Sequence, residues 1–317
     1  MFRLFDLVII AYLLFAFFIV YALIRHFLKL QKFSKIAKRR WQICAFLFFW
    51  ITGSIMFYGS FIEPKMIEMT HAKIDINKTP QQENLKIAFI SDFHLGPYKK
   101  FDFLNNVIEK TIEQKPDLIL LGGDFIFNKE SEAKYFTTLD RLTAVAPTFA
   151  ILGNHEYHSS YNDKSEIQNK TGLLQTTLND TGIKILKNQN ELLTINGTKF
   201  YLIGLDDIDA ELDDYQKAAD NLEAAIPKII LVHSPDFILK KPVGTDLILT
   251  GHTHGGQIRL PLIGSLAPIP TNLGRAYDMG LFNISGGQMF ISRGIGESGT
   301  RARLFCRPEI SILNVNF

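Results

Sequence analysis

The sequence contains few cysteines: Cys44 and Cys306 are the only two in 317 residues. Cys44 lies inside a long apolar segment, whereas Cys306 lies near the C-terminus. Two such distant thiols give no disulfide framework, and this usage fits either redox compartment. The chain also shows no internal repeat and no low-complexity segment. Its length allows one large globular domain of about 200–250 residues and a remainder of about 60.

An excess of positive charge is also missing from most of the chain. The formal net charge is +2, but 8 basic residues and 1 acidic residue fall within residues 1–62. The remaining residues therefore carry 26 basic and 31 acidic side chains, a net charge of about −5. Because nucleic-acid binding normally needs a basic surface, we expect no nucleic acid as a partner.

Long apolar runs are confined to the N-terminus. Residues 4–24 carry Asp6 as their single charge, and residues 41–62 carry none. Each run is about long enough to cross a hydrocarbon core of ~30 Å as a helix. A cleaved signal peptide is the alternative for the first run, but its apolar stretch is too long and no small-residue cleavage site is evident. We therefore predict a membrane anchor of two transmembrane helices over residues 1–62.

The segment between the two runs is strongly basic. Residues 25–40 contain seven Lys or Arg residues and no acid. The positive-inside rule places such a short loop in the cytoplasm, so the remainder of the chain is predicted on the non-cytoplasmic side of the inner (plasma) membrane. Binding of the loop to anionic headgroups of the cytoplasmic leaflet is an alternative that leaves this multi-pass topology unchanged.

The pattern changes twice after the anchor. Residues 63–84 are polar, contain Pro64 and Pro80, and are predicted to be a linker with one edge strand. Residues 85–317 alternate short apolar runs with amphipathic stretches, which indicates an α/β domain with a parallel sheet and covering helices. Asn196-Gly197 between two β-forming runs is a strong hairpin signal. A mixed sheet, or two sheets packed together, is therefore expected.

Polar motifs follow five of the predicted strands. They are Asp92-x-His94, Gly122-Gly123-Asp124, Gly153-Asn154-His155-Glu156, His233 and the segment from Gly251 through His252 and His254 to Gln257. Ligands gather beyond the carboxyl ends of strands in α/β sheets, so these side chains should meet in one crevice. Any one motif alone is more often a turn or a helix cap. Together they hold five of the eight histidines.

These residue types suit a pair of metal ions. Imidazole binds Zn, Fe or Mn, carboxylate suits harder cations, and an aspartate can bridge two ions with its two oxygens. Two ions about 3.5–4 Å apart can hold a hydroxide between them and polarise a phosphoryl group. The glycines of the motifs allow tight turns and close approach of the backbone to an anionic substrate.

With these motifs in order, the chain from residue 86 onward resembles the calcineurin-like metallophosphoesterases. The resemblance implies a four-layer α/β/β/α sandwich and two divalent metal ions, with Mn, Zn and Fe all open. It assigns one ion to Asp92, His94, Asp124 and His254. It assigns the other to Asp124, Asn154, His233 and His252. His155 then resembles the family's histidine that stabilises the transition state or protonates the leaving oxygen. Glu156 would orient the His155 imidazole or lie just outside the metal ligands.

Residues 251–264, 291–299 and 307–313 are similar to the membrane-attached bacterial branch of that family. This branch includes enzymes that cleave UDP-2,3-diacylglucosamine in lipid A synthesis. The chain departs from the branch at Glu297 and Thr300, where Thr and Pro are commoner. Protein Ser/Thr phosphatases need Asp-Arg-Gly soon after the second motif, whereas Phe125 follows Asp124 directly here.

The expected function is that of a membrane-anchored dinuclear phosphoesterase acting on a phosphodiester or pyrophosphate, lipid-linked or in the cell envelope. One alternative is a UDP-2,3-diacylglucosamine hydrolase, although that substrate is made on the cytoplasmic side, so this reading needs an interfacial helical hairpin. Another is a catalytically silent metal-binding membrane scaffold. Two further questions stay open: whether Arg293, Arg301 and Arg303 clamp phosphate or form surface salt bridges, and whether His158 contacts the substrate.

Overall fold

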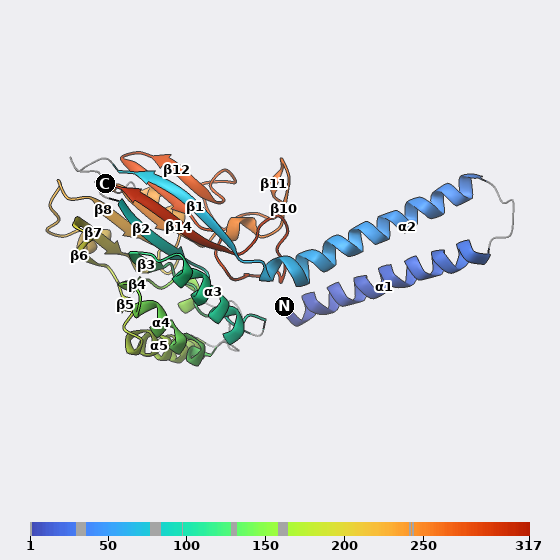
Figure 1. Ribbon diagram of the computed structural model, residues 1–317, viewed down its shortest axis with the longest axis horizontal. Helices are drawn as coiled ribbons and strands as arrows, with labels where there is room; N and C mark the ends of the chain where they lie inside the picture. The colour runs from blue at the N-terminus through green and yellow to red at the C-terminus, as the bar shows by residue number, and fades with distance from the viewer. Residues whose placement is uncertain are drawn as a thin grey trace.

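Two six-stranded sheets lie face to face in the computed structural model (Figure 1), which describes residues 2–29, 36–76, 84–96, 98–127, 132–157, 164–240, 242 and 244–317. The first sheet has the order β1 (Glu68–Asp75), β14 (Glu309–Asn316), β2 (Asn84–Ile90), β3 (Leu118–Leu121), β4 (Thr148–Ala150) and β5 (Lys184–Ile185). The second has the order β12 (Gly280–Ile284), β13 (Gly287–Ile291), β9 (Leu247–Thr250), β8 (Lys228–Leu231), β7 (Thr198–Gly204) and β6 (Gln189–Ile195). The prediction of two packed sheets is confirmed.

The space between the sheets is an apolar core. Alternate residues of the first sheet, among them Ile87 and Phe89 of β2, point into it and meet Leu202, Leu231 and Leu249 of the second sheet. All five side chains are fully buried. The other face of each sheet is also apolar, which explains why the central strands read as unbroken apolar runs rather than as alternating patterns.

Helical segments cover both outer faces and complete the four layers. On the first sheet they are α3 (Phe101–Glu113), η3 (Ala133–Leu139), α4 (Asp140–Thr143) and α5 (Lys164–Asp180). On the second sheet the cover is thinner, because α6 (Tyr215–Ala218) and η5 (Pro235–Lys240) are both short. The predicted α/β/β/α sandwich is therefore confirmed, with one helical layer reduced to short segments and loops.

Strand direction determines where the site forms. Strands β2, β3 and β4 run parallel, and β7, β8, β9 and β13 run parallel in the second sheet. Each set therefore presents its carboxyl ends at one edge. The hairpin predicted at Asn196-Gly197 joins β6 to β7, and both turn residues have positive φ (51° and 89°), as a type I′ turn requires.

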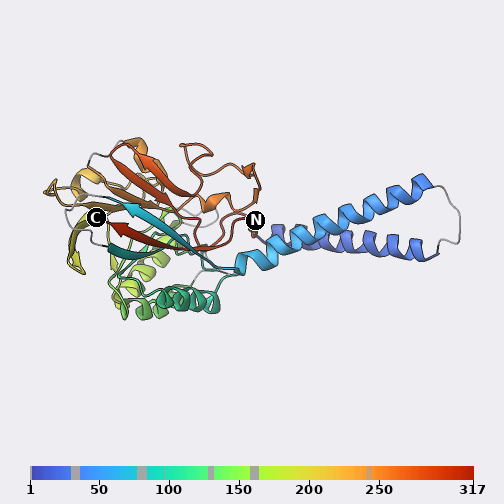
Figure 2. The same cartoon turned by 45° about the horizontal axis from the view of Figure 1, so that its top comes forward.

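The N-terminus forms a separate pair of helices, α1 (Phe2–Lys29) and α2 (Ile36–Phe57), which run side by side away from the sheets (Figure 2). Two stretches are long and apolar enough to cross a membrane: Asp6–His26, with a mean hydropathy of 2.9, and Arg40–Lys65, with 1.6. Only 11% of the residues in each stretch are buried within the protein. Such exposure of apolar side chains is weak evidence for membrane association.

A short helical segment connects α2 to the sheets. It consists of η1 (Tyr58–Ile62) and η2 (Glu63–Lys65), and β1 begins after two intervening residues. Within the segment predicted as a linker, β1 is an edge strand that pairs parallel with β14 over its whole length. The part of that segment at 77–83 lies outside the described residues, as do His158 and the centre of the basic loop at 30–35.

Candidate metal centre

All seven predicted metal ligands follow strands of the two sheets. Asp92 and His94 come after β2, Asp124 after β3 and Asn154 after β4. The second sheet contributes His233 after β8, and His252 and His254 after β9. Because these strands are parallel neighbours, their ends meet across the gap between the sheets.

One group of four ligand atoms belongs to Asp92, His94, Asp124 and His254, and these atoms all lie within 4.8 Å of one another. The Nε2 atoms of His94 and His254 are 3.2 Å apart. His254 Nε2 lies 3.4 Å from Asp92 Oδ1, and His94 Nε2 lies 3.3 Å from Asp124 Oδ2. All four residues are buried. Two carboxylates and two imidazoles at these separations are a donor set for one divalent cation.

A second group shares Asp124 and adds His233 and His252, again within 4.8 Å. His233 Nε2 lies 3.2 Å from Asp124 Oδ2 and has no hydrogen-bond partner among the described residues. Asn154 Oδ1 is likewise buried without a partner in the described structure. Buried polar atoms are normally satisfied, so two buried atoms without a partner beside this group fit a cation that they would both bind.

Asp124 faces both groups with a single oxygen. Its Oδ1 accepts a hydrogen bond of 2.9 Å from the backbone N–H of His155, whereas Oδ2 faces the imidazoles of His94 and His233. Although burial disfavours its charge, His233 and His155 hold the pKa of the Asp124 carboxyl well below its usual range. His233 correspondingly has its pKa raised well above the usual value, mainly by Asp124, against the effect of burial. The carboxylate thus requires a positive charge beside Oδ2.

The backbone of the centre is strained. Five of the seven predicted ligands are non-glycine residues with positive φ, between 42° and 68°: Asp92, His94, Asp124, His252 and His254. This left-handed region costs of order 1 kcal/mol or more for each such residue and is concentrated at functional sites. The strands on either side hold these turns in place, so the ligand side chains are directed by the fold itself.

Two glycines make room for the ligands. A Cβ on Gly153 would lie 2.3 Å from Asp124 Oδ1, and one on Gly251 would lie 2.4 Å from Asp92 Oδ2. Neither distance is compatible with a real side chain. The space beside Gly153 is therefore filled by the Asp124 carboxylate, and the space beside Gly251 by the Ser91 hydroxyl and the Asp92 carboxylate. This role differs from the predicted approach of the backbone to substrate.

Glu156 is fully buried and accepts hydrogen bonds from three backbone amides. Its Oε2 accepts from Asp124 (3.0 Å) and Gly153 (2.8 Å), and its Oε1 accepts from Ile126 (2.9 Å). Burial, together with the nearby Asp124 carboxylate, raises the pKa of Glu156 to about 8, while the amides act in the opposite direction. The side chain thus joins the loop after β3 to the loop after β4.

His155 stands at the edge of the centre. Its Nδ1 lies 3.2 Å from the carbonyl oxygen of Phe127, and its ring packs edge-on against His94 with centroids 4.4 Å apart. Burial lowers the pKa of this imidazole to about 4. This contact assigns the tautomer in which Nδ1 carries the proton and donates to the Phe127 carbonyl. Nε2 is then unprotonated and can accept a hydrogen bond.

An acidic segment after β7 was not among the predicted site residues. Asp209 Oδ2 lies 3.3 Å from His252 Nε2, and burial raises the pKa of the nearby Asp207 to about 7. Asp206 accepts a hydrogen bond of 2.5 Å from the hydroxyl of Tyr157, just past the β4 motif. The signal was the same as for the other strands, an apolar run followed by carboxylates.

The three late arginines are all engaged within the protein. Arg293 pairs with Glu309 (3.1 Å) and Glu68 (3.0 Å), and Arg301 pairs with Asp6 (3.5 Å). Arg303 is fully buried and donates to the backbone carbonyls of Arg293, Gly294, Gly296 and Cys306. Salt bridging and loop support, rather than phosphate clamping, describe these contacts.

The unusual Glu297 has a local explanation. Its carboxylate lies 2.6 Å from the buried ammonium of Lys99 and 3.4 Å from Nε of Arg303. Phe93 and Phe125 are buried and stack on each other in the core, with ring centroids 4.7 Å apart.

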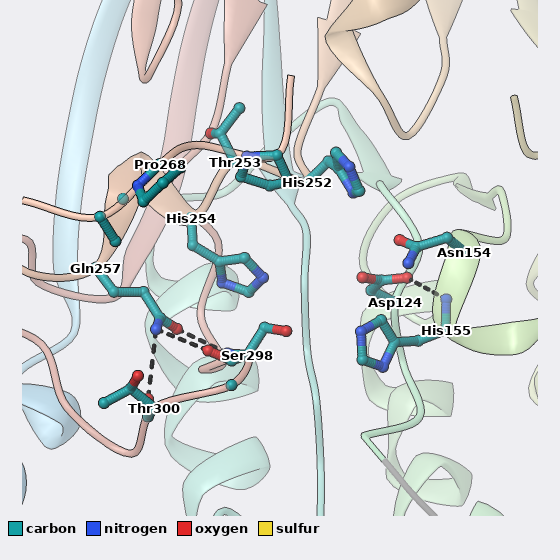
Figure 3. A pocket seen from close by; sticks show the side chains of 14 residues that line it. Asp124, Asn154, His155, His252, Thr253, His254, Gln257, Pro268, Ser298 and Thr300 are labelled. Atoms are coloured by element: carbon teal, nitrogen blue, oxygen red, sulfur yellow. Dashed lines mark hydrogen bonds between the residues drawn. The ribbon is translucent and has the colours of Figure 1, made fainter. Parts of the chain in front are cut away.

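The centre opens into a pocket of about 280 Å³ (Figure 3). Asp124, Asn154 and His155 line one side, and His252 and His254 face them across the pocket. Gln257 donates to the carbonyl oxygens of Ser298 and Thr300 and so joins the last motif to a loop that forms another wall. The remaining wall is apolar and consists of Ala267, Pro268 and Pro270.

This combination of a four-layer sandwich, a strand-end crevice and two overlapping donor groups that share one aspartate defines a metal-dependent hydrolase. Residues 85–256 match the family model described as calcineurin-like phosphoesterase, and the chain belongs to that family. Members of the family depend on two divalent metal ions.

Named relatives cover most of the chain. It is 34% identical to phosphodiesterase YaeI of Escherichia coli (strain K12), over 83% of this chain and 94% of that protein. It is 32% identical to the uncharacterized metallophosphoesterase YkuE of Bacillus subtilis (strain 168), over 81% and 88%. Identity to the UDP-2,3-diacylglucosamine pyrophosphatase LpxG of Chlamydia muridarum is 28%, over 81% and 91%.

Proposed function

We propose that the chain is a membrane-anchored phosphoesterase that hydrolyses a phosphodiester or pyrophosphate bond in a lipid-linked or cell-envelope substrate. The observation that carries the proposal is the pair of donor groups joined by Oδ2 of Asp124 at the base of the pocket. Asp92, His94, Asp124 and His254 would hold one cation, and Asp124, Asn154, His233 and His252 the other. When bound, two divalent cations activate water and neutralise charge on the phosphoryl oxygens.

The protein's own groups would then orient the substrate and move the proton. The His155 ring is fixed by Phe127 and has Nε2 available toward a bound phosphate. Its neutral form is favoured by burial, and an entering anionic phosphate would raise its pKa toward that of a general acid. The Glu156 carboxylate, bonded to three amides, keeps the Asp124 and Asn154 loops in register and acts as a positioning residue.

The activity is testable on the full chain in detergent with bis(p-nitrophenyl) phosphate and added Mn²⁺. Asp124→Asn and His252→Ala should lower kcat/KM by at least about 10²-fold, because each removes a ligand from the centre. Asp180→Asn, an exposed change at the end of α5, is the matched control and should leave the rate unchanged. Full activity in Asp124→Asn, or bound metal with no turnover of any phosphodiester, would reject the proposal in favour of a silent metal-binding scaffold.

UDP-2,3-diacylglucosamine is the second candidate substrate, and the likeness to LpxG favours it. Against it, the basic loop at 25–40 predicts a non-cytoplasmic domain, whereas this nucleotide lipid is made on the cytoplasmic side. Thin-layer assays of the purified chain against phospholipids and UDP-2,3-diacylglucosamine distinguish the two substrate classes. A reporter fused after Phe317 distinguishes the sides: alkaline phosphatase activity supports an outside domain, and fluorescence of a cytoplasm-only reporter contradicts it.

A further inference from the structure

An exposed apolar hairpin lies at the end of the domain nearest the two long helices (Figure 1). It is formed by β10 (Arg259–Leu260) and β11 (Gly264–Ser265). Leu262 and Ile263 at its turn are 107% and 64% exposed, and Phe305 beside them is 59% exposed. We call Leu262, Ile263 and Phe305 the apolar tip. Large apolar side chains that gather on a surface mark a contact site rather than ordinary solvent-facing positions.

The base of the hairpin is joined by backbone hydrogen bonds to the end of the second helix. The Arg259 N–H donates to the carbonyl of Leu304 (2.9 Å), and the N–H of the preceding Arg303 donates to the carbonyl of Gly59 in η1 (2.9 Å). The two backbones lie close together there: a Cβ on Gly59 would lie only 3.2 Å from the carbonyl oxygen of Arg303. The apolar tip is therefore held at a fixed place beside the domain end of α2.

The first helix reaches the same region. Asp6, near the start of α1, pairs with Arg301 and accepts a hydrogen bond from the hydroxyl of Tyr98. The Arg301 guanidinium also lies over the rings of Tyr98 (4.0 Å) and Phe61 (5.2 Å). Both helices and the apolar tip thus converge on one end of the domain, around the loop that carries Arg301.

The hairpin also touches the metal centre. Arg259 Nη1 donates to the carbonyl of Gly255 (2.7 Å), directly after His254, and pairs with Asp278. On the other side, the Ser265 hydroxyl donates to the carbonyl of Ala267 (2.7 Å), which begins the apolar wall of the pocket. A group bound at the apolar tip would therefore lie next to a wall of the catalytic pocket.

We infer that the apolar tip inserts into the surface of the same bilayer that α1 and α2 cross, which places the pocket's apolar wall beside the lipid headgroups. Leu, Ile and Phe side chains on a short protruding loop suit the headgroup and acyl boundary, and the apolar helices lead to the same level. The inference rests on the proposed membrane anchor and deepens it. The corresponding substrate is a phosphate ester that keeps its acyl chains in the membrane.

Spin labelling of the full chain in phospholipid vesicles tests the contact. In a Cys44→Ala background, nitroxide labels are placed at Leu262→Cys and, as a second tip position, at Phe305→Cys. Ile51→Cys on α2 is the lipid reference, and Leu192→Cys on β6 is an equally apolar, exposed position at the far side of the domain. Cys306 is buried against the His254 carbonyl and stays in place.

The measured quantity is the ratio of collisions with oxygen, which concentrates in lipid, to collisions with a water-soluble nickel chelate. At residues 262 and 305 we expect a ratio several-fold above that at residue 192 and below that at residue 51, which lies near the middle of the apolar stretch Arg40–Lys65. Aqueous values at both tip positions, with a lipid value at residue 51, would overturn the contact alone. Aqueous values at residue 51 as well would overturn the anchor on which it rests. Neither measurement depends on turnover, so loss of the proposed activity is a separate outcome.

Discussion

Gly153→Ala is the sharpest test of how the metal centre is built. The φ of Gly153 is −116°, a value that alanine adopts freely, so backbone strain plays no part. The new Cβ would lie 2.3 Å from Asp124 Oδ1 and 2.9 Å from His233 Cδ2. Since real Cβ contacts do not fall below 3.0 Å, Oδ1 must move by at least about 0.7 Å.

That displacement acts on the oxygen that fixes Asp124. Oδ1 is bonded to the His155 N–H, so its movement turns the carboxylate and displaces Oδ2 from both imidazoles. Overpacking of a tight site costs about 1–3 kcal/mol of folding stability. A ligand misplaced by nearly 1 Å lowers the rate by roughly 10²-fold. A 10²-fold loss of rate corresponds to about 2.7 kcal/mol, so the losses of activity and of folding stability should be similar in free energy.

The assay combines three measurements on one preparation: hydrolysis of bis(p-nitrophenyl) phosphate with Mn²⁺, metal content by mass spectrometry, and the urea midpoint. Gly172→Ala in α5 is the matched control, because a Cβ there has no neighbour within 4 Å. That change should keep activity and raise stability by up to about 1 kcal/mol. Wild-type activity and metal content in Gly153→Ala would refute the steric account of the site.

Three further changes test other parts of the centre. Glu156→Ala removes the acceptor of three buried backbone amides, so it should cost about 1–3 kcal/mol in urea unfolding, whereas full stability would contradict the amide contacts. Asp207→Asn should stabilise the metal-free protein more at pH 8 than at pH 4. The raised pKa of Asp207, about 7, means that the native state binds more protons than the unfolded state between about pH 4 and 7, so wild-type stability falls as pH rises through that window. An equal gain at both pH values would contradict this. Chelation with EDTA should abolish hydrolysis and lower Tm, both restored by Mn²⁺, because the cation binds the native state alone; an unchanged Tm in calorimetry would count against a bound metal.

Local sequence patterns predicted an α/β domain with a mixed sheet or two packed sheets, and the strand-end motifs, whereas the four-layer sandwich came from the family resemblance. Apolar runs such as 85–90 and 118–121 became β2 and β3, and the side chains that follow each run came together because the strands are parallel neighbours. The pattern could locate each motif in the chain. It could not specify the distances between motifs, which depend on how the two sheets pack.

The acidic segment at 206–209 was missed for a topological reason. The Asn196-Gly197 turn identifies the run that becomes β7 as half of an antiparallel hairpin, and hairpin strands end at turns rather than at sites. In the structure β7 also pairs parallel with β8, the strand that carries His233. This second pairing turns the carboxyl end of β7 toward the centre and brings Asp209 to His252.

The helix contacts were beyond sequence reasoning because they join distant positions. Asp6 appeared as an isolated charge at the outer end of an apolar run, and Arg301 as an arginine near a late strand. Their ion pair links residues almost 300 positions apart and depends on the turn of the chain through η1 and η2. No local periodicity encodes such a contact.

The geometry of Asp124 changes the chemical interpretation of the motif. An aspartate can join two cations through two oxygens, but here the His155 N–H occupies Oδ1 and leaves Oδ2 to face both donor groups. Asp92, His94 and His254 would hold one cation beside this oxygen, and Asn154, His233 and His252 would hold the other. Gly153 is the residue that makes this arrangement possible, since any side chain there would fill the space of Oδ1. The glycine, the N–H and the carboxylate therefore act as one unit, and the backbone of the Gly-Asn-His motif sets the orientation of Asp124 Oδ2.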